Sequence, residues 1–410
     1  MIEIISICIL LLIYLWVLYN VPILTVGIRQ RTKYRSLRLK DINPGDLPRF
    51  SVIVPAKNEE AVIGRLLEAL LKVNYPPRKR EIIVVEGGST DNTAKICMEY
   101  AGKYPRQIRL FQEGLSRGKP SALNHALDHA KGEIVAVFDA DNVPDPDILL
   151  RAANYFRDPS VAAVQGTMHS INAEENMLTK IASREEAAWF QSVMLGRDAL
   201  NLFVPLTGSC QFIRREVLEE LGGWDESSLA EDVEMTVRLN ERGYTVKLAV
   251  DVESWQETPT SITQLIRQRM RWFQGYMETT IKYGRLLTKM SRLNLDVEVT
   301  LLGPYVLVLC FLSYLTTSMT FLFPIRANPV LGALAYTATL LMVVTLLLVG
   351  LVLVHMSKPR KIRNLLWIPF IYAYWILQTL IATHALTQVI LRRPRKWTRT
   401  MKTGTVTIGD

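Results

Sequence analysis

The sequence predicts an α/β, Rossmann-like domain joined to transmembrane α-helices. Between about Pro48 and Gly275, short runs of β-branched residues alternate with helix-like stretches, and charge-free runs long enough to cross a bilayer lie on either side. The 410 residues are 49% hydrophobic with a mean hydropathy of +0.14, which is too apolar for an ordinary soluble chain. The charged fraction of 21% is too high for a bundle of membrane helices alone.

Residues 1–28 are the predicted N-terminal transmembrane helix. The uncharged run Ile4–Ile28 is 25 residues long, and about 20 residues are enough to cross the hydrocarbon. No basic residue precedes the run and no small-x-small site closes it, so we expect a retained anchor rather than a cleaved signal peptide. The basic juxtamembrane linker 29–47 then places the following domain on the cytoplasmic face.

Residues 48–275 form the predicted cytoplasmic domain. Strands are expected at 50–55, 81–85, 108–111 and 134–139, and helices at 61–72, 93–104 and 235–239. Repeated strand–helix–strand units predict a parallel sheet with helices on both faces. The loops at the carboxyl ends of its strands should therefore build the active site.

The remaining chain is predicted to return to the membrane. An interfacial amphipathic helix is expected within 276–298, followed by three apolar membrane segments in 299–391 and a basic tail, 392–410. Three crossings from a cytoplasmic start would put this basic tail outside, against the positive-inside tendency. Either the last apolar run re-enters the membrane, or the tail is an exception to that rule.

Charge and cysteine content exclude several classes of protein. Three tracts hold 16 basic residues and no acidic ones, which leaves 32 basic against 39 acidic residues elsewhere. Basic clusters beside apolar runs indicate a membrane surface rather than nucleic acid, which we do not expect as a partner. The four cysteines have neither metal-ligand nor disulfide-framework spacing.

The strongest chemical signal is an apolar strand that ends in Asp139-Ala140-Asp141. Where the chain turns out of a sheet, two such carboxylates can converge on one hard cation and the phosphates bound to it. Asp-x-Asp is also common in ordinary turns, so this motif depends on its neighbours.

Polar residues also follow the first two expected strands. Pro55, Ala56, Asn58 and Glu59 close the first, and Glu86, Gly87, Gly88 and Asp91 close the second. The glycines permit close backbone approach, and the polar groups can contact a base and ribose. Two capped strand-to-helix turns would leave the same pattern. Gly118-Lys119 does not belong to a P-loop motif. Two alternatives stay open for Lys119, a place beside a nucleotide phosphate and an ordinary solvated helix start.

Two later segments can complete a site. Glu231 and Asp232 precede a helix-like run, where one ionised carboxylate could take a proton from an attacking hydroxyl, or both could simply favour a helix start. Gln268, Arg271 and Trp272 lie on an amphipathic stretch. There, Trp can stack on a sugar ring and Arg can neutralise a departing diphosphate, although both also suit a lipid surface.

In this order and spacing, the motifs resemble the family-2 glycosyltransferases of GT-A fold. The similarity is greatest to the membrane branch with cellulose, hyaluronan, chitin-oligosaccharide and poly-N-acetylglucosamine synthases, and the tail Trp397–Gly404 also looks like the end of such enzymes. The resemblance implies an inverting hexosyltransferase that uses a nucleotide-sugar, expected to be a UDP-sugar, and Mg²⁺ or Mn²⁺.

The resemblance also implies roles for the residues named above. Asp141, with Asp139 beside it, would hold the metal, and Asp232 would be the catalytic base, with Glu231 next to it. The predicted nucleotide site is Pro55, Ala56, Asn58, Glu59, Glu86, Asp91, Lys119, Asp139 and Ala140. Gln268, Arg271 and Trp272 would close over the diphosphate and acceptor, and Gly208 and Ser209 would face the acceptor. Glu86-Gly87 departs from the usual Asp-Asp or Asp-Gly, which bears on donor preference.

Three functions remain open from the sequence. The first is a synthase that extends and exports a β-linked polysaccharide. The second adds one sugar to a lipid acceptor, and the third is a non-catalytic nucleotide-binding scaffold or transporter. Within the four apolar runs no acidic residue, Lys or Arg indicates an ion path, which disfavours a transporter.

Overall fold

The computed structural model describes residues 2–33, 45, 47–113, 117–284, 291–322, 329–356, 362–393 and 402–404. The chain forms two compact units. The sheet unit comprises Val26–Gln264 and Arg399–Asp410, and the helical unit comprises Met1–Thr25 and Leu265–Thr398. The tail residues 397–401 and most of the linker 29–47 lie outside the described residues.

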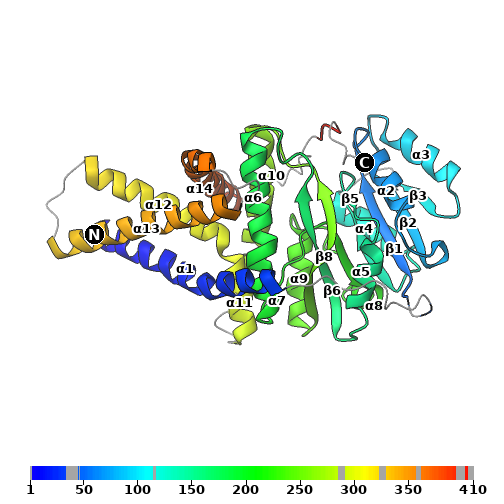
Figure 1. Cartoon of the computed structure of the whole chain (residues 1–410), viewed down its shortest axis with the longest axis horizontal. Coiled ribbons are helices and arrows are strands. Elements are labelled where there is room, and N and C mark those ends of the chain that lie inside the picture. The colour runs from blue at the N-terminus through cyan, green and yellow to red at the C-terminus, as the bar shows by residue number, and fades with distance from the viewer. Residues whose placement is uncertain are drawn as a thin grey trace. The chain divides into compact units, whose positions relative to one another are not determined.

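The sheet unit is built on one eight-stranded sheet with the order β3-β2-β1-β4-β7-β6-β8-β5 (Figure 1). The strands are β1 Phe50–Ala56, β2 Arg80–Glu86, β3 Ile108–Gln112, β4 Ile134–Val137, β5 Val143–Pro144, β6 Val161–Ser170, β7 Gln211–Arg214 and β8 Thr245–Gln256. The predicted α/β class is confirmed, and so is a parallel half made by β1 to β4.

The expectation of a wholly parallel sheet is wrong. The short strand β7 runs antiparallel to both of its neighbours, β4 and β6, and β5 runs antiparallel to β8. The predicted strand 134–139 also ends two residues early, because Asp139 already belongs to the loop. Four residues are too short a run to predict either β7 or its direction.

Helices cover both faces of the sheet. They are α2 Ile63–Leu71, α3 Thr93–Lys103, α4 Lys119–Leu127, α5 Ile148–Tyr155, α6 Met177–Ala188, α7 Leu195–Ala199, α8 Arg215–Glu220 and α9 Glu231–Glu241, with short η3 Pro77–Lys79 and a π-helix, η4 Trp189–Met194. Because successive strand residues point to opposite faces, Val52 and Val54 pack with α2 and α5, whereas Ile53 packs with α4 and α8. Both faces of the sheet are therefore closely packed, and the loops at the carboxyl ends of its strands start from fixed positions.

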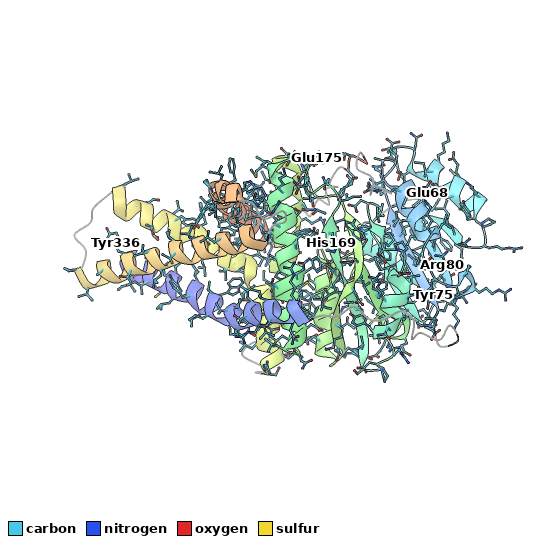
Figure 2. All side chains as sticks on the ribbon, viewed as in Figure 1. Glu68, Tyr75, Arg80, His169, Glu175 and Tyr336 are labelled. Carbon is cyan, nitrogen blue, oxygen red and sulfur yellow. The ribbon has the colours of Figure 1, made fainter. Side chains whose placement is uncertain are left out.

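Arg80, labelled in Figure 2, completes the helix beside β1. Its guanidinium donates to the carbonyl oxygens of Leu70, Val73 and Leu71 at 2.8, 2.9 and 2.9 Å. The last carbonyls of a helix have no partner within it, so this buried arginine satisfies groups at and just beyond the end of α2.

The helical unit contains the apolar segments. Its helices are α10 Ile262–Tyr283, which begins in the sheet unit, α11 Arg292–Leu301, α12 Gly303–Leu322, α13 Pro329–Met356 and α14 Ile368–Ile390, with η5 Ile362–Trp367, and it holds most of α1 Ile2–Lys33. In the region 276–298, where an interfacial amphipathic helix is predicted, α10 ends at Tyr283 and α11 begins at Arg292.

By length and composition, two described helical segments can cross a membrane, Ile4–Arg31 and Asn364–Ile390. Arg292–Leu301 and Gly303–Met319, bent by 51°, would be a third if they form one broken span. Within this unit the Tyr19 hydroxyl donates to Asp296 at 2.7 Å, which ties α1 to α11.

Candidate active site

Several predicted site residues of the sheet unit follow strands that end at the same edge of the sheet. β1, β2 and β4 are parallel, so Ala56, Glu86 and Asp139 lie at or just past their carboxyl ends. The antiparallel β7 begins at this edge, because Gln211 pairs with Val137. Topology therefore brings together loops that are far apart in sequence.

The first two loops are tied to each other by hydrogen bonds. Asn58, at φ 55°, donates its backbone N–H to Ser89 Oγ at 2.8 Å, and its Oδ1 accepts from the Thr90 N–H at 2.7 Å. The Glu59 N–H donates to Thr93 Oγ1 at 2.7 Å, and Asp91 Oδ1 accepts from the Thr93 N–H at 3.0 Å. Asn58 and Asp91 thus already hold the two loops in shape.

Glu86 is buried, and its carboxylate closes its own loop. Its Oε1 accepts from the Ser89 N–H at 2.6 Å, while its backbone pairs in register with Ala56. Pro55, one residue earlier, pairs with Val85. The longer Glu side chain, where an Asp is usual, is therefore engaged in loop structure.

Lys119 pairs with two carboxylates and lies near a third, that of Asp232. Its Nζ lies 2.7 Å from Asp139 Oδ1 and 3.2 Å from Glu231 Oε1, and it donates to the Gly208 carbonyl at 2.7 Å. Burial alone would lower the pKa of Lys119, but the charges of Asp139, Glu231 and Asp232 raise it above its usual value. Lys119 therefore stays charged and balances these acids.

Gly208 lets Asp232 approach the loop before β7. Its φ is +80°, and an added Cβ would lie 3.0 Å from Asp232 Oδ2 and 3.2 Å from Lys119 Nζ. Asp232 lies in the first turn of α9, and its backbone carbonyl accepts from Thr236 Oγ1 at 2.7 Å. A side chain at position 208 would crowd both charged groups.

Ser209 fixes the backbone at Asp139 through its hydroxyl. Its hydroxyl accepts from the Asp139 N–H at 2.9 Å and donates to Asn142 Oδ1 at 3.0 Å. The residue is buried, and its hydroxyl fixes the backbone of the Asp139–Asp141 loop. Ala140, in the same loop, is also buried.

Asp141 points to a second basic residue. Its Oδ2 lies 2.6 Å from Lys402 Nζ and accepts from the Glu257 N–H at 3.0 Å. Burial would raise the pKa of Asp141, but the Lys402 ammonium and the hydrogen bonds hold it below the usual value. Asp141 is therefore ionised, as a cation ligand must be.

Glu257 and Arg65 were missed from the sequence, and Lys402 was quoted only as part of the tail. Glu257 follows β8 and is buried, with one carboxylate oxygen 3.1 Å from Arg65. Arg65 also donates to the Asp141 carbonyl at 3.1 Å. An acidic residue directly after a strand, followed by Thr-Pro, was the available signal for Glu257.

The carboxylates fit a divalent cation that is shared with a phosphate ligand. Among the residues that the structure describes, no group of three or more His, Cys, Asp or Glu side chains could hold a metal by itself. Mg²⁺ is commonly bound by one or two carboxylates together with substrate phosphates, and Asp139 and Asp141 can supply that number. Their oxygen chemistry and the ionised state of Asp141 suit Mg²⁺ or Mn²⁺.

Gln268, Arg271 and Trp272 lie on α10, within the helical unit. Their predicted role in closing over the diphosphate and acceptor therefore stays a prediction. Nearby, the Arg269 guanidinium lies 4.5 Å from the Trp272 ring centroid and donates to the Tyr374 hydroxyl at 3.2 Å. One face of the predicted stacking tryptophan is thus covered by a cation.

Comparisons with known proteins identify the family of this chain. Residues 48–275 match a family described as "Glycosyltransferase like family 2". The chain is 31% identical over 376 residues to a beta-monoglucosyldiacylglycerol synthase of Nostoc, an alignment that covers 88% of this chain and 78% of the relative. It is 26% identical over 300 residues to a poly-beta-1,6-N-acetyl-D-glucosamine synthase of Staphylococcus epidermidis, covering 72% and 71%.

A solved structure shows the same fold. The mannosyltransferase PcManGT from Pyrobaculum calidifontis, in complex with GDP-Man and Mn²⁺, superposes with a TM-score of 0.65 and 22% identity, over 96% of this chain and 100% of that one. The matched family covers more than half of the 410 residues and includes every predicted site residue. This chain therefore belongs to glycosyltransferase family 2, its sheet unit has the GT-A fold, and it is a glycosyltransferase.

Proposed function

We propose that the protein transfers one sugar from a nucleoside diphosphate sugar, expected to be a UDP-sugar, to a hydroxyl of a membrane lipid, with inversion at the anomeric carbon. The observation that carries this proposal is the gathering of Asp139, Glu231 and Asp232 around Lys119, beside the ionised Asp141. One site then holds acids for two tasks, deprotonating an acceptor and holding a diphosphate.

Asp232 is the proposed base. Its carboxylate lies in the first turn of α9 and faces the Gly208 loop, where it can take the proton of an attacking hydroxyl. Attack opposite the leaving diphosphate converts an α-linked donor to a β-glycoside without a covalent intermediate. The lipid-glycosylating relative is named for a β product, which supports this stereochemistry.

Lys119 and Glu231 position the reacting groups. Glu231 is largely buried and holds Lys119 at 3.2 Å, and Lys119 holds Asp139 at 2.7 Å. Asp139 and Asp141 would hold the divalent cation, which neutralises the charge that develops on the departing diphosphate. The tied loops of Asn58 and Asp91 would frame the nucleotide, as their place at the carboxyl edge of the sheet favours.

A lipid acceptor is favoured by the relatives and by the apolar helices. The glucosyldiacylglycerol synthase matches this chain with higher identity and over more of its length than the polysaccharide synthase does. Helices that can cross a bilayer would hold the enzyme where a lipid hydroxyl is presented. We place the catalytic unit on the cytoplasmic side, where nucleotide sugars are made, with Gln268, Arg271 and Trp272 closing over the diphosphate and acceptor.

The second candidate is a synthase of a β-linked polysaccharide. The poly-N-acetylglucosamine synthase relative and the Gln268, Arg271 and Trp272 pattern favour it. The same site chemistry serves both reactions, so they differ only in what the acceptor is and in how often transfer repeats.

Product size separates the two candidates. Purified full-length protein in diacylglycerol-containing vesicles would be incubated with Mn²⁺ and radiolabelled UDP-glucose, UDP-N-acetylglucosamine or GDP-mannose. We expect one lipid-soluble product carrying a single sugar. A ladder of water-soluble products would instead support the polysaccharide synthase, and transfer that is unaffected by excess chelator would contradict the metal role.

A further inference from the structure

A short segment, Lys402–Gly404, is docked on the proposed metal ligand. Lys402 Nζ lies 2.6 Å from Asp141 Oδ2, and their side chains are only 13% and 6% exposed. The same oxygen accepts the Glu257 N–H at 3.0 Å. The carboxylate that would bind a cation therefore already holds a buried positive charge.

Glu257 anchors the docked segment independently of Asp141. Its two carboxylate oxygens accept from the backbone N–H groups of Thr403 and Gly404 at 2.8 and 3.0 Å, and its carbonyl accepts from Lys402 Nζ at 2.8 Å. Gly404 has φ +65°, and an added Cβ would lie 2.3 Å from the Ala61 carbonyl oxygen. This close fit requires glycine and indicates a specific docking site.

Lys402 and a divalent cation cannot share Asp141 Oδ2. That oxygen already accepts from the Lys402 ammonium at 2.6 Å and from the Glu257 N–H at 3.0 Å, and an ammonium and a metal ion bound to the same oxygen would repel each other. We propose that Lys402 is the resident counter-ion of Asp141, positioned by Glu257, and that a divalent cation binds Asp141 only by displacing the Lys402 ammonium. This inference rests on the proposed function, because it takes Asp141 as a metal ligand.

The exchange requires little rearrangement. Thr403 and Gly404 bond to Glu257 through their backbones, so these contacts can persist while the Lys402 side chain rotates away from Asp141. Before metal arrives, Lys402 keeps the buried Asp141 charge paired, which avoids the large cost of an isolated buried ion. Lys402 is thus a positioning residue that competes with the cation.

Direct Mn²⁺ binding tests the competition. Free Mn²⁺ would be titrated by electron paramagnetic resonance against the full-length protein in detergent. In the wild type only the molecules in which Lys402 has left Asp141 can bind Mn²⁺, so the apparent affinity for Mn²⁺ is reduced by that fraction. We expect Lys402→Met to bind Mn²⁺ about tenfold more tightly than the wild type. Lys247→Met is the matched control, because Lys247 pairs with Asp198 at 3.6 Å, and it should leave the affinity unchanged.

Asp141→Asn separates the two hypotheses. It should abolish the specific Mn²⁺ site with either Lys or Met at position 402. If Asp141→Asn binds Mn²⁺ like the wild type, the metal assignment itself is wrong. If it loses Mn²⁺ while Lys402→Met retains wild-type affinity, the metal assignment survives and the counter-ion role is wrong.

Lysine acetylation followed by mass spectrometry reports the displacement itself. In the wild type, Mn²⁺ should raise the modification rate of Lys402 relative to Lys247. In Asp141→Asn, Lys402 should react rapidly even without Mn²⁺. Mn²⁺ that binds without changing the reactivity of Lys402 would overturn the inference.

Discussion

Lys119 is the residue on which the charge balance of the site depends. It contacts Asp139 and Glu231 directly, and its pKa is also raised by the charge of Asp232. Three carboxylates close together repel one another unless a positive charge lies among them. By pairing with two of them, Lys119 offsets that repulsion and holds Asp139 and Glu231 near each other.

Asp232→Asn tests the proposed base. An amide of the same shape cannot take a proton, so turnover should fall by a factor of about 10² to 10⁴ while donor binding changes little. Turnover and donor affinity would be measured on the same full-length preparation. Asp225→Asn is a suitable control, because the Asp225 carboxylate accepts hydrogen bonds from Ser227 in an exposed turn. An Asp232→Asn protein with the turnover of the control would remove Asp232 from the mechanism.

Asp141→Ala tests the metal ligand by activity. Loss of this carboxylate should weaken metal-dependent donor binding by about a hundredfold or more, since even outer partners of a metal site are worth 10- to 100-fold. The Mn²⁺ concentration that gives half-maximal transfer would be compared with that of Asp147→Ala, whose carboxylate lies in the next turn and accepts from Asn74. An unchanged Mn²⁺ requirement in Asp141→Ala would contradict the assignment.

The elements differ in how far the sequence predicts them. β1 and β2 are continuous apolar runs that end in Gly, Pro or polar residues, so their pattern alone indicates buried strands. β6 contains Ala and Gly, which are not typical of strands, and β7 has only four residues. Neither shows a clear strand pattern of apolar residues in the sequence. The insertion of an antiparallel β7 between β4 and β6 is a matter of long-range pairing, which local pattern does not encode.

The site residues also differ in how far the sequence predicts them. Asp139, Asp141, Glu231 and Asp232 stand in short local motifs and could be selected from the sequence. Glu257 meets Asp141 across 116 positions, and it is held by a docked segment that lies still further along the chain. No local pattern records such a contact, since it depends on β8 ending at the edge where β4 also ends.

Arg80 should be the principal stabiliser of α2. Arg80→Met keeps the length of the side chain but removes the guanidinium that donates to the carbonyls of Leu70, Leu71 and Val73, so we expect a loss of about 3 kcal/mol in the stability of the sheet unit. Arg78→Met, at an exposed neighbouring position, should change stability by less than about 0.5 kcal/mol.

The alkylation rate of Cys97 can be used to measure the stability of the sheet unit in Arg80→Met. Burial, with smaller contributions from the charges of Glu86 and Asp91, raises the pKa of the Cys97 thiol to about 12, so it reacts only when the unit opens. Its alkylation rate, followed by mass spectrometry, should rise about a hundredfold in Arg80→Met and stay near the wild type in Arg78→Met. Equal rates in the two variants would show that the carbonyl contacts add little.

The whole molecule is constrained by where the chain returns to the sheet unit. Residues 265–398 belong to the helical unit, but Lys402–Gly404 contacts Asp141 and Glu257 in the sheet unit. Both ends of the helical stretch must therefore lie on the same side of a membrane. We therefore expect an even number of crossings between residues 265 and 398, with two of the three apolar runs predicted in 299–391 crossing and one not.

Labelling with a membrane-impermeant maleimide tests this topology. Single cysteines would be placed at Asp128, Ala327 and Asp410 in a chain whose Cys8 and Cys310 are replaced by alanine, since Cys97 and Cys210 are buried. In sealed vesicles, the cysteines at 128 and 410 should react from the same side, because the docked segment places both in one compartment. The bent pair α11 and α12, if it crosses as one span, puts position 327 on the other side. Labelling of 410 from the side opposite to 128 would mean that three segments cross, and Lys402 could not reach Asp141 in the membrane-bound enzyme.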